Sequence, residues 1–406
     1  MTTAEDISMN DDPRARRNAR IYALGQALYG AHTVTLITTG GLIGKALSSD
    51  PSLATLPISA FVFGTMITAI PASWWMRQVG RRVGFMTGAF LGFISAICGL
   101  LAILNESFVA FTLAMVLTGA YQAFSMLYRF AATDLASPSF KAKAIAWVTI
   151  GGLAAAFLGP AIVISTKNLI PNAPFAGCYL TIAGLAVISA LMMLALDNPD
   201  GVKRDRADTG RSLGVILRHP RLLVAIFAGM MSFGMMNLVM TATPLAMVDC
   251  GFTVDTAAIV IQWHVIAMYA PSFFTGGLIN RFGVEKVIST GMFVLAAAGI
   301  AALLGLHVAN FSIGLILLGV GWNFSFVGAT AMVTDHYTPA EKNKVQGIND
   351  FCVFATVAVA SLSSGKLLHL FGWDAVNLAL FPMILITLLL FAWLYLSGRA
   401  QKPALN

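Results

Sequence analysis

Charged side chains are scarce in this chain: only 11% of its 406 residues are Asp, Glu, Lys or Arg, whereas 58% are hydrophobic. Soluble domains carry about 25% charged residues. Apolar runs of about 20 residues, each long enough to cross a bilayer, recur along the whole sequence. The composition therefore excludes an ordinary soluble domain and predicts an all-α protein of many transmembrane helices, embedded in a lipid bilayer.

Cysteine and catalytic motifs are scarce as well. The four cysteines, Cys98, Cys178, Cys250 and Cys352, are scattered and form no C-x-x-C pair, which argues against a disulfide framework. The sequence contains no H-E-x-x-H zinc motif and no G-x-x-x-x-G-K-[ST] phosphate loop. We therefore expect neither an enzyme nor an ATP-driven pump. The polar segments are also too short for the soluble output domain of a membrane sensor.

The positions of the charges predict the topology. The loops between successive predicted helices must lie on alternating sides of the membrane. Nearly all Lys and Arg residues then fall on one side, and the other side holds little more than Lys45, Lys167 and Lys366. This positive-inside bias predicts that both termini are cytoplasmic, and it explains the net charge of +7 without a nucleic-acid role. The twelve predicted transmembrane segments are 20–45, 54–77, 84–104, 107–130, 142–166, 174–196, 221–247, 255–280, 286–306, 309–333, 345–368 and 372–397.

The chain divides into two similar halves. A polar segment at 197–220 predicts a cytoplasmic linker between six-helix bundles at 20–196 and 221–397, with a basic N-terminal segment at 1–19 and a cytoplasmic tail at 398–406. The pattern T-D-x-x-x-P-x-x-K-x-K occurs in both halves, 201 residues apart, from Thr133 to Lys143 and from Thr334 to Lys344. The same pattern between the fourth and fifth helix of each half indicates an internal repeat.

A second repeated motif follows the second helix of each half. The segments Ser73–Arg82 and Gly276–Lys286 resemble the loop signature G-x-x-x-D-R-x-G-R-R of the major facilitator superfamily. The acidic position is Arg77 in the first copy and Asn280 in the second, which argues against a gate built on that carboxylate. The resemblance implies two bundles related by a pseudo-two-fold axis, a substrate near the midplane and transport by alternating access. The matching residues are Gly80, Arg81, Arg82, Gly276, Arg281 and Gly283.

Soft and ionisable side chains inside the predicted helices are the main candidates for function, because such groups are costly in lipid. The stretch WHVIAMY places His264 and Met268 four residues apart on one helical face, and Met236 and Met240 have the same spacing in the preceding helix. Thioethers suit Cu(I), and imidazole suits several transition metals. The four side chains therefore form a candidate metal site. The structural alternative is a neutral His264 hydrogen-bonded between helices.

These paired motifs resemble those of the CcoA-like copper importers, a family whose relatives include riboflavin carriers. The resemblance implies import of copper, expected as Cu(I), across the bacterial inner membrane for cytochrome oxidase biogenesis, with copper as the transported substrate and no prosthetic group. It also implies a cytoplasmic copper carrier as partner, and we expect a monomer. Cys250 lies where that family has a cysteine, but a second expected cysteine upstream is absent. An organic solute such as riboflavin, stacked on Phe and Trp side chains, is the alternative substrate.

The remaining candidates are single polar residues. His32 is expected either to complete the site from the first bundle or to stabilise helix packing. Gln122 and Asn323 occupy equivalent places in the two halves, and interhelical hydrogen bonding is favoured over lining a cavity. Asp350 could relay protons, although pairing with a basic residue is favoured. The candidate gate or coupling residues are Arg77, Arg81, Arg129, Asp134, Asn280, Asp335 and Asp350.

Overall fold

The computed structural model describes residues 12–137, 140–197, 210–338 and 341–398, and every regular element in these ranges is a helix. Backbone polar groups find no hydrogen-bond partner in lipid, so an apolar chain crosses a bilayer as helices. Much of the predicted N-terminal segment, linker and tail lies outside the described residues, as do positions 138–139 and 339–340 of the repeated T-D-x-x-x-P motif.

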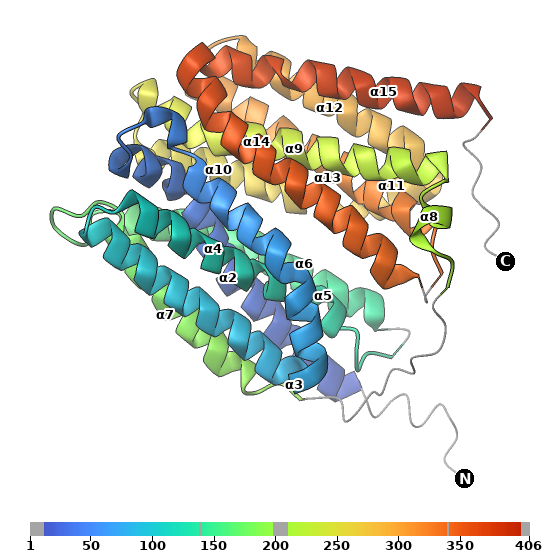
Figure 1. Cartoon of the computed structure of the whole chain (residues 1–406), viewed down its shortest axis with the longest axis horizontal. Coiled ribbons are helices and arrows are strands. Elements are labelled where there is room, and N and C mark those ends of the chain that lie inside the picture. Colours follow the sequence, from blue (N-terminus) through green and yellow to red (C-terminus); the bar gives the residue numbers. More distant parts are fainter. Residues whose placement is uncertain (1–11, 138–139, 198–209, 339–340, 399–406) are drawn as a thin grey trace. The chain divides into compact units, whose positions relative to one another are not determined.

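The helices form two compact units, residues 1–50 with 56–203 and residues 51–55 with 204–406. Figure 1 labels the elements. The first unit contains α2 (Asp12–Leu47), α3 (Leu56–Leu104), α4 (Phe108–Ser125), α5 (Tyr128–Ala131), α6 (Lys141–Thr166) and α7 (Ala176–Met193). The second contains η1 (Pro51–Leu53), α8 (Leu213–Ile216), α9 (Pro220–Asp249), α10 (Val254–Tyr269), α11 (Ser272–Phe282), α12 (Val284–Leu303), α13 (Val308–Thr334), α14 (Lys342–Leu378) and α15 (Leu380–Leu396).

Two glycines divide helices that are too long for one crossing. α3 has 49 residues, which would be about 74 Å if straight, against about 30 Å of hydrocarbon. Gly80 breaks it at φ 81°, and Gly372 breaks the 37-residue α14 at φ 79°. Both values lie in the region that favours glycine. With α10 and α11 as one bent span and α14 continuing into α15, the predicted twelve-helix membrane fold is confirmed.

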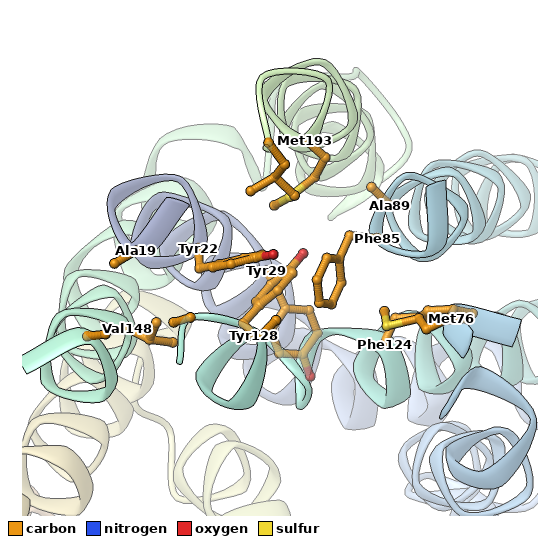
Figure 2. Packing of buried hydrophobic residues seen from close by; sticks show 14 of the residues in the cluster. Ala19, Tyr22, Tyr29, Met76, Phe85, Ala89, Phe124, Tyr128, Val148 and Met193 are labelled. Atoms are coloured by element: carbon orange, nitrogen blue, oxygen red, sulfur yellow. The ribbon is translucent and has the colours of Figure 1, made fainter. Parts of the chain in front are cut away.

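The core of the first unit is built on aromatic rings from three helices. Tyr22 of α2, Phe85 of α3 and Tyr128 of α5 are each at most 1% exposed, and Figure 2 shows their side chains near one another. The Tyr22 and Phe85 ring centroids are 5.3 Å apart, and those of Phe85 and Tyr128 are 4.8 Å apart. Such pairs add about 0.5–1.5 kcal/mol each beyond their buried area, so this cluster fixes α2 against α3.

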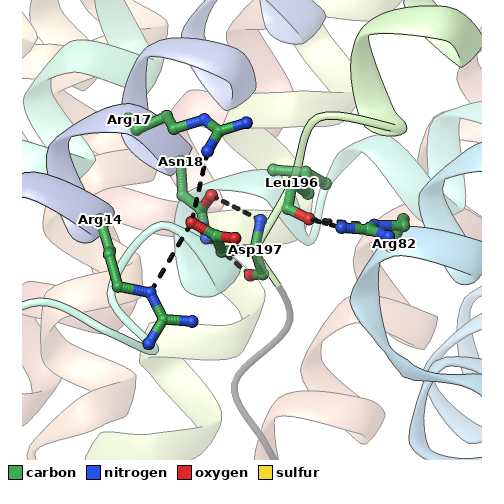
Figure 3. Close-up of polar contacts among 6 residues, drawn as sticks. All are labelled: Arg14, Arg17, Asn18, Arg82, Leu196 and Asp197. Atoms are coloured by element: carbon green, nitrogen blue, oxygen red, sulfur yellow. Dashed lines mark hydrogen bonds and ion pairs between the residues drawn. The ribbon is translucent and has the colours of Figure 1, made fainter.

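A polar cluster ties the start of α2 to the residues after α7, as Figure 3 shows. Asp197 N donates to Asn18 Oδ1 at 3.0 Å, and Asn18 Nδ2 donates to Asp197 O at 2.9 Å. The Asp197 carboxylate lies 3.7 Å from Arg14 Nε and 3.7 Å from Arg17 Nη1. Because both arginines are more than half exposed, the paired amide contacts contribute more to this cluster than the charges do.

The described end of the linker is held to the second unit by a buried carboxylate. Glu341, whose side chain is 2% exposed, accepts hydrogen bonds from Arg211 N, Nε and Nη2 at 2.7–2.8 Å and from Thr338 N at 3.0 Å. The Arg211 guanidinium, followed by the backbone donors, holds the pKa of the Glu341 carboxyl well below its ordinary value. The pair fixes the chain just before α8 and α9.

The two units repeat one polar contact between helices. Thr65 Oγ1 of α3 donates to Gln122 Oε1 of α4 at 3.3 Å, and Thr275 Oγ1 of α11 donates to Asn323 Oδ1 of α13 at 2.6 Å. In each unit the amide side chain therefore joins two helices through a hydrogen bond from a threonine.

The second unit also uses Asn323 at a break inside a span. α10 and α11 meet at an angle of 41°, next to Pro271, which has no backbone N–H to continue the helix. Asn323 Nδ2 donates to Met268 O at 2.7 Å and to Ser272 Oγ at 2.6 Å. The Asn323 amide thus supplies donors where the break interrupts the helical hydrogen bonds, and it joins both halves of the bent span to α13.

We expect Asn323→Leu to destabilise the protein. The substitution leaves Met268 O, Ser272 Oγ and Thr275 without a partner on α13, and an unsatisfied buried group costs about 1–3 kcal/mol. The measurement is the apparent melting temperature of the purified protein in detergent. Gln122→Leu is the matched control in the first unit, and it should lower the melting temperature less. Equal melting temperatures for Asn323→Leu and wild type would contradict the role of the amide at the break.

We expect Glu341→Gln to destabilise the protein at pH 7 by roughly 1–3 kcal/mol, because it replaces a buried ion pair whose partner Arg211 is one-third exposed. The folded-state pKa is depressed, so this stabilisation is present above the ordinary value of 4.5 and is lost as the pH falls below it. Thermal unfolding at pH 7 and about pH 3 should show the difference between the two proteins narrowing in acid, and its full loss requires a pH below the depressed folded-state pKa. The exposed Glu106→Gln serves as control, and a wild-type advantage as large at about pH 3 as at pH 7 would refute the account.

Candidate functional site

The four predicted metal ligands lie in the second unit and are all buried. Met236 and Met240 of α9 are 1% and 4% exposed, and His264 and Met268 of α10 are 0% and 8% exposed. α10 packs more extensively against α13 than against α9. An added Cβ at Gly319 of α13 would lie 2.7 Å from His264 O. The His264–Met268 face is therefore positioned chiefly by α13.

The His264 ring is hydrogen-bonded through one of its two nitrogens. Its Nδ1 lies 2.7 Å from Leu315 O of α13, and its Nε2 has no hydrogen-bond partner. Because a carbonyl only accepts, Nδ1 carries the proton and Nε2 holds a lone pair. This tautomer suits a metal ligand, and the bond is also the interhelical contact of the structural alternative. No group of three His, Cys, Asp or Glu in the described residues could hold a metal ion, so binding here would depend on the thioethers.

His32 and Cys250 differ sharply in their surroundings. His32 of α2 is 1% exposed, neither ring nitrogen has a hydrogen-bond partner, and its ring lies edge-on to Tyr121 with centroids 5.8 Å apart. Cys250 caps the end of α9 and is exposed. Loss of hydration and then the Asp249 charge raise the pKa of its thiol, which disfavours the metal-binding thiolate. Cys250 is exposed and its metal-binding form is disfavoured, whereas the predicted Met and His ligands are buried.

One pair of the predicted gate residues is joined directly. Arg81 Nε donates to Asp134 Oδ2 at 2.9 Å, with both side chains about one-quarter exposed. The next residue, Arg82, donates from Nε and Nη2 to Leu196 O at 2.9 and 2.5 Å, as Figure 3 shows. The first loop motif therefore connects α3 to the segment after α5 and to the end of α7, although its acidic position is replaced by Arg77.

The other predicted gate residues occupy separate places. Arg77, Arg129, Asn280 and Asp350 are exposed. The Arg129 guanidinium lies 4.9 Å from the centroid of the adjacent Phe130 ring, and Asp350 Oδ1 accepts a hydrogen bond from Asn349 Nδ2 at 3.1 Å. Asp335 caps the C-terminus of α13. These positions give no continuous chain of titratable groups through the described helices.

A group of four aromatic side chains in the second unit was missed in the sequence. Phe233 of α9 lies 5.5 Å from Trp322 and 5.0 Å from Phe326 of α13, and 6.2 Å from Phe354 of α14, between ring centroids. Trp322 and Phe326 stack with an interplanar angle of 14° and centroids 5.2 Å apart. Their four-residue spacing was the available signal, but the other two rings come from distant helices. We refer to these four residues as the aromatic cluster.

The comparisons with known proteins agree on the family. The sequence profile of the Major Facilitator Superfamily matches residues 22–270 and 225–406. The riboflavin transporter RfnT of Brucella anthropi is 48% identical over 382 residues, which cover 94% of this chain and 96% of that protein. The uncharacterized MFS-type transporter YddS of Bacillus subtilis is 26% identical over 408 residues, 96% of this chain and 93% of that protein.

Solved structures share the fold at low sequence identity. The nucleoside transporter NupG has a TM-score of 0.73 at 14% identity, covering 94% of this chain and 98% of that one. The POT family transporter PepTSo has a TM-score of 0.74 at 12% identity, covering 95% and 98%. Because the profile, the relatives and the fold all extend over nearly the whole sequence, the chain belongs to the Major Facilitator Superfamily and is a multi-pass membrane transporter.

Proposed function

We propose that this transporter carries riboflavin, or a closely related flavin, across the bacterial inner membrane by alternating access. The observation that carries the proposal is the 48% identity to a riboflavin transporter over 94% of the chain. The alternative substrate predicted from the sequence therefore becomes the preferred one. None of the relatives supports the copper prediction, and His264 has a packing role through its bond to Leu315.

The distribution of buried charge supports an uncharged solute. Among the described residues, the buried Arg and Glu are Arg221 and Glu341. Arg221 is the second residue of α9 and Glu341 is the N-cap of α14, so both lie at the end of a span and not at its middle. A charged substrate held at the membrane midplane would require an opposite charge there. Riboflavin needs none, because its ring system and ribityl chain are neutral. Aromatic, hydroxyl and amide side chains are sufficient to bind it.

The orientation belongs to the same proposal. The excess of Lys and Arg on one set of loops supports a cytoplasmic location for both termini. The linker held by Arg211 and Glu341 would then lie at the inner face.

We expect expression of this chain to restore growth, at low external riboflavin, of a bacterium that neither synthesises nor imports the vitamin. Uptake of labelled riboflavin should saturate and be competed by unlabelled riboflavin but not by Cu(I). The control is an empty vector, with membrane insertion of the transporter verified by immunoblot. Absence of saturable riboflavin uptake by correctly inserted protein would overturn the proposed function.

We expect the combined variant Met236→Leu, Met240→Leu and Met268→Leu to keep riboflavin uptake within about twofold of wild type, because methionine-to-leucine changes conserve volume in a core. The copper content of the cells, measured by mass spectrometry, should be the same whether they express wild type, the variant or neither. Copper accumulation that requires wild type and disappears in the variant would instead re-establish the predicted metal site.

A further inference from the structure

We propose that the aromatic cluster of Phe233, Trp322, Phe326 and Phe354 binds the isoalloxazine ring of the flavin by stacking. This assignment rests on the proposed function, and it names the part of the protein that would distinguish a flavin from other solutes. A flat tricyclic ring with large π faces is the portion of riboflavin that a polar solute such as ribitol lacks.

The geometry of the cluster suits a planar ring. Trp322 and Phe326 lie nearly parallel, with Phe233 meeting each of them at 64°. A flavin placed parallel to the Trp322–Phe326 pair would extend the stack, while Phe233 would bound it from the side. Phe233 and Phe326 are only partly buried, so the cluster is not sealed by the rest of the chain. Offset stacking of this kind is the favoured geometry between aromatic rings.

A buried polar atom in the cluster also requires a partner. Trp322 is 8% exposed, and its indole Nε1 has no hydrogen-bond acceptor in the structure. An indole N–H can only donate, and leaving it unpaired inside a protein is costly. The N–H bond lies in the plane of the indole, so its acceptor must lie beyond the edge of the stacked ring. A hydroxyl oxygen of the ribityl chain, which leaves the plane of the isoalloxazine, would satisfy Trp322 Nε1, so this residue would supply both a stacking face and a hydrogen bond.

An amide lies beside the cluster. Asn237 follows Phe233 by four residues and therefore shares its face of α9. Its side chain is 5% exposed, and its Oδ1 accepts a hydrogen bond from Thr241 Oγ1 at 3.3 Å, which leaves the amide nitrogen as a donor. The pyrimidinedione edge of isoalloxazine presents two carbonyl oxygens. Asn237 is thus suited to bind that edge while the rings stack.

The cluster lies at the depth expected for a transported solute. Phe233 is close to the midpoint of α9, Trp322 is close to the midpoint of α13, and Phe354 is near the middle of the part of α14 that precedes Gly372. α9 contacts both α13 and α14. Transporters bind their substrates near the bilayer midplane, which favours a binding role for rings converging there.

The test measures flavin binding to the purified full-length chain in detergent. Riboflavin and lumiflavin, which has the ring without the ribityl chain, are titrated while their fluorescence is followed, because stacking on tryptophan quenches it. The variants are Trp322→Leu, Trp322→Phe and Phe326→Leu. The matched control is Phe324→Leu on the same helix, since the Phe324 ring instead lies 6.3 Å from Phe274 of α11.

Wild type should bind both flavins with quenching, and D-ribitol should not compete. Trp322→Leu and Phe326→Leu should weaken the binding of both flavins, raising each Kd by about tenfold or more. Trp322→Phe, which keeps a ring but loses the N–H donor, should raise the Kd of riboflavin by about threefold to fivefold and leave that of lumiflavin unchanged. Phe324→Leu should leave both unchanged. Melting temperatures without ligand separate these losses from unfolding, and Trp322→Phe remains informative if a leucine variant fails to fold.

The outcomes separate this assignment from the proposed function. If wild type neither binds nor takes up riboflavin, the proposed function fails. If wild type binds riboflavin while the folded Trp322 and Phe326 variants bind it equally well, the stacking assignment is overturned and riboflavin transport stands. Loss of riboflavin binding with unchanged lumiflavin binding in the two leucine variants would also overturn the assignment, because it would place both rings at the ribityl chain alone.

Discussion

The structure depends on one constraint: inside a bilayer, every backbone N–H and C=O must find its partner within the protein. The break at Gly80 falls between two predicted spans and the break at Gly372 at the first residue of the last one, where water can supply partners. The break beside Pro271 lies inside a predicted span, and there α13 provides Asn323 to donate to Met268 O and Ser272 Oγ. The bent span is therefore coupled to α13 by a side chain that replaces missing helical hydrogen bonds.

Corresponding positions of the internal repeat make contacts in both units, but the residue types and the interactions differ. Both units join two helices through a threonine and an amide, Gln122 in one and Asn323 in the other. The repeated motif places Phe140 where the second copy has Glu341. The Arg16 guanidinium lies 5.6 Å from the Phe140 ring centroid, whereas Arg211 forms an ion pair with Glu341. In the first unit, Arg16 contacts this motif position by cation–π attraction. In the second unit, Arg211 contacts the same position by charge pairing.

The spans were predictable because apolar length alone distinguishes them, but their ends depend on packing. The first span was predicted to begin at residue 20, whereas α2 begins at Asp12, because Ala15, Ala19 and Tyr22 pack into the core at helical spacing. The place of His264 within an apolar helical segment was visible in the sequence. Its bond to Leu315 was not, because it requires α13 to approach α10 at Gly319. The aromatic cluster was hidden for the same reason, since Phe233, Trp322 and Phe354 meet only after three helices pack.

The predicted metal ligands and the aromatic cluster show why residue types alone did not identify the substrate. Methionine fills irregular spaces in a core and requires no metal to be stable there. A buried imidazole that donates to a carbonyl already has a structural role, which His264 fulfils through Leu315. His264 Nε2 and Trp322 Nε1 are both buried without a hydrogen-bond partner, so an unsatisfied atom alone does not distinguish a metal ligand from a flavin site. The surroundings do, because Trp322 belongs to a group of converging rings that no structural role in the polar network requires, whereas His264 is already bonded to α13. This physical distinction favours the proposed flavin over a soft metal ion.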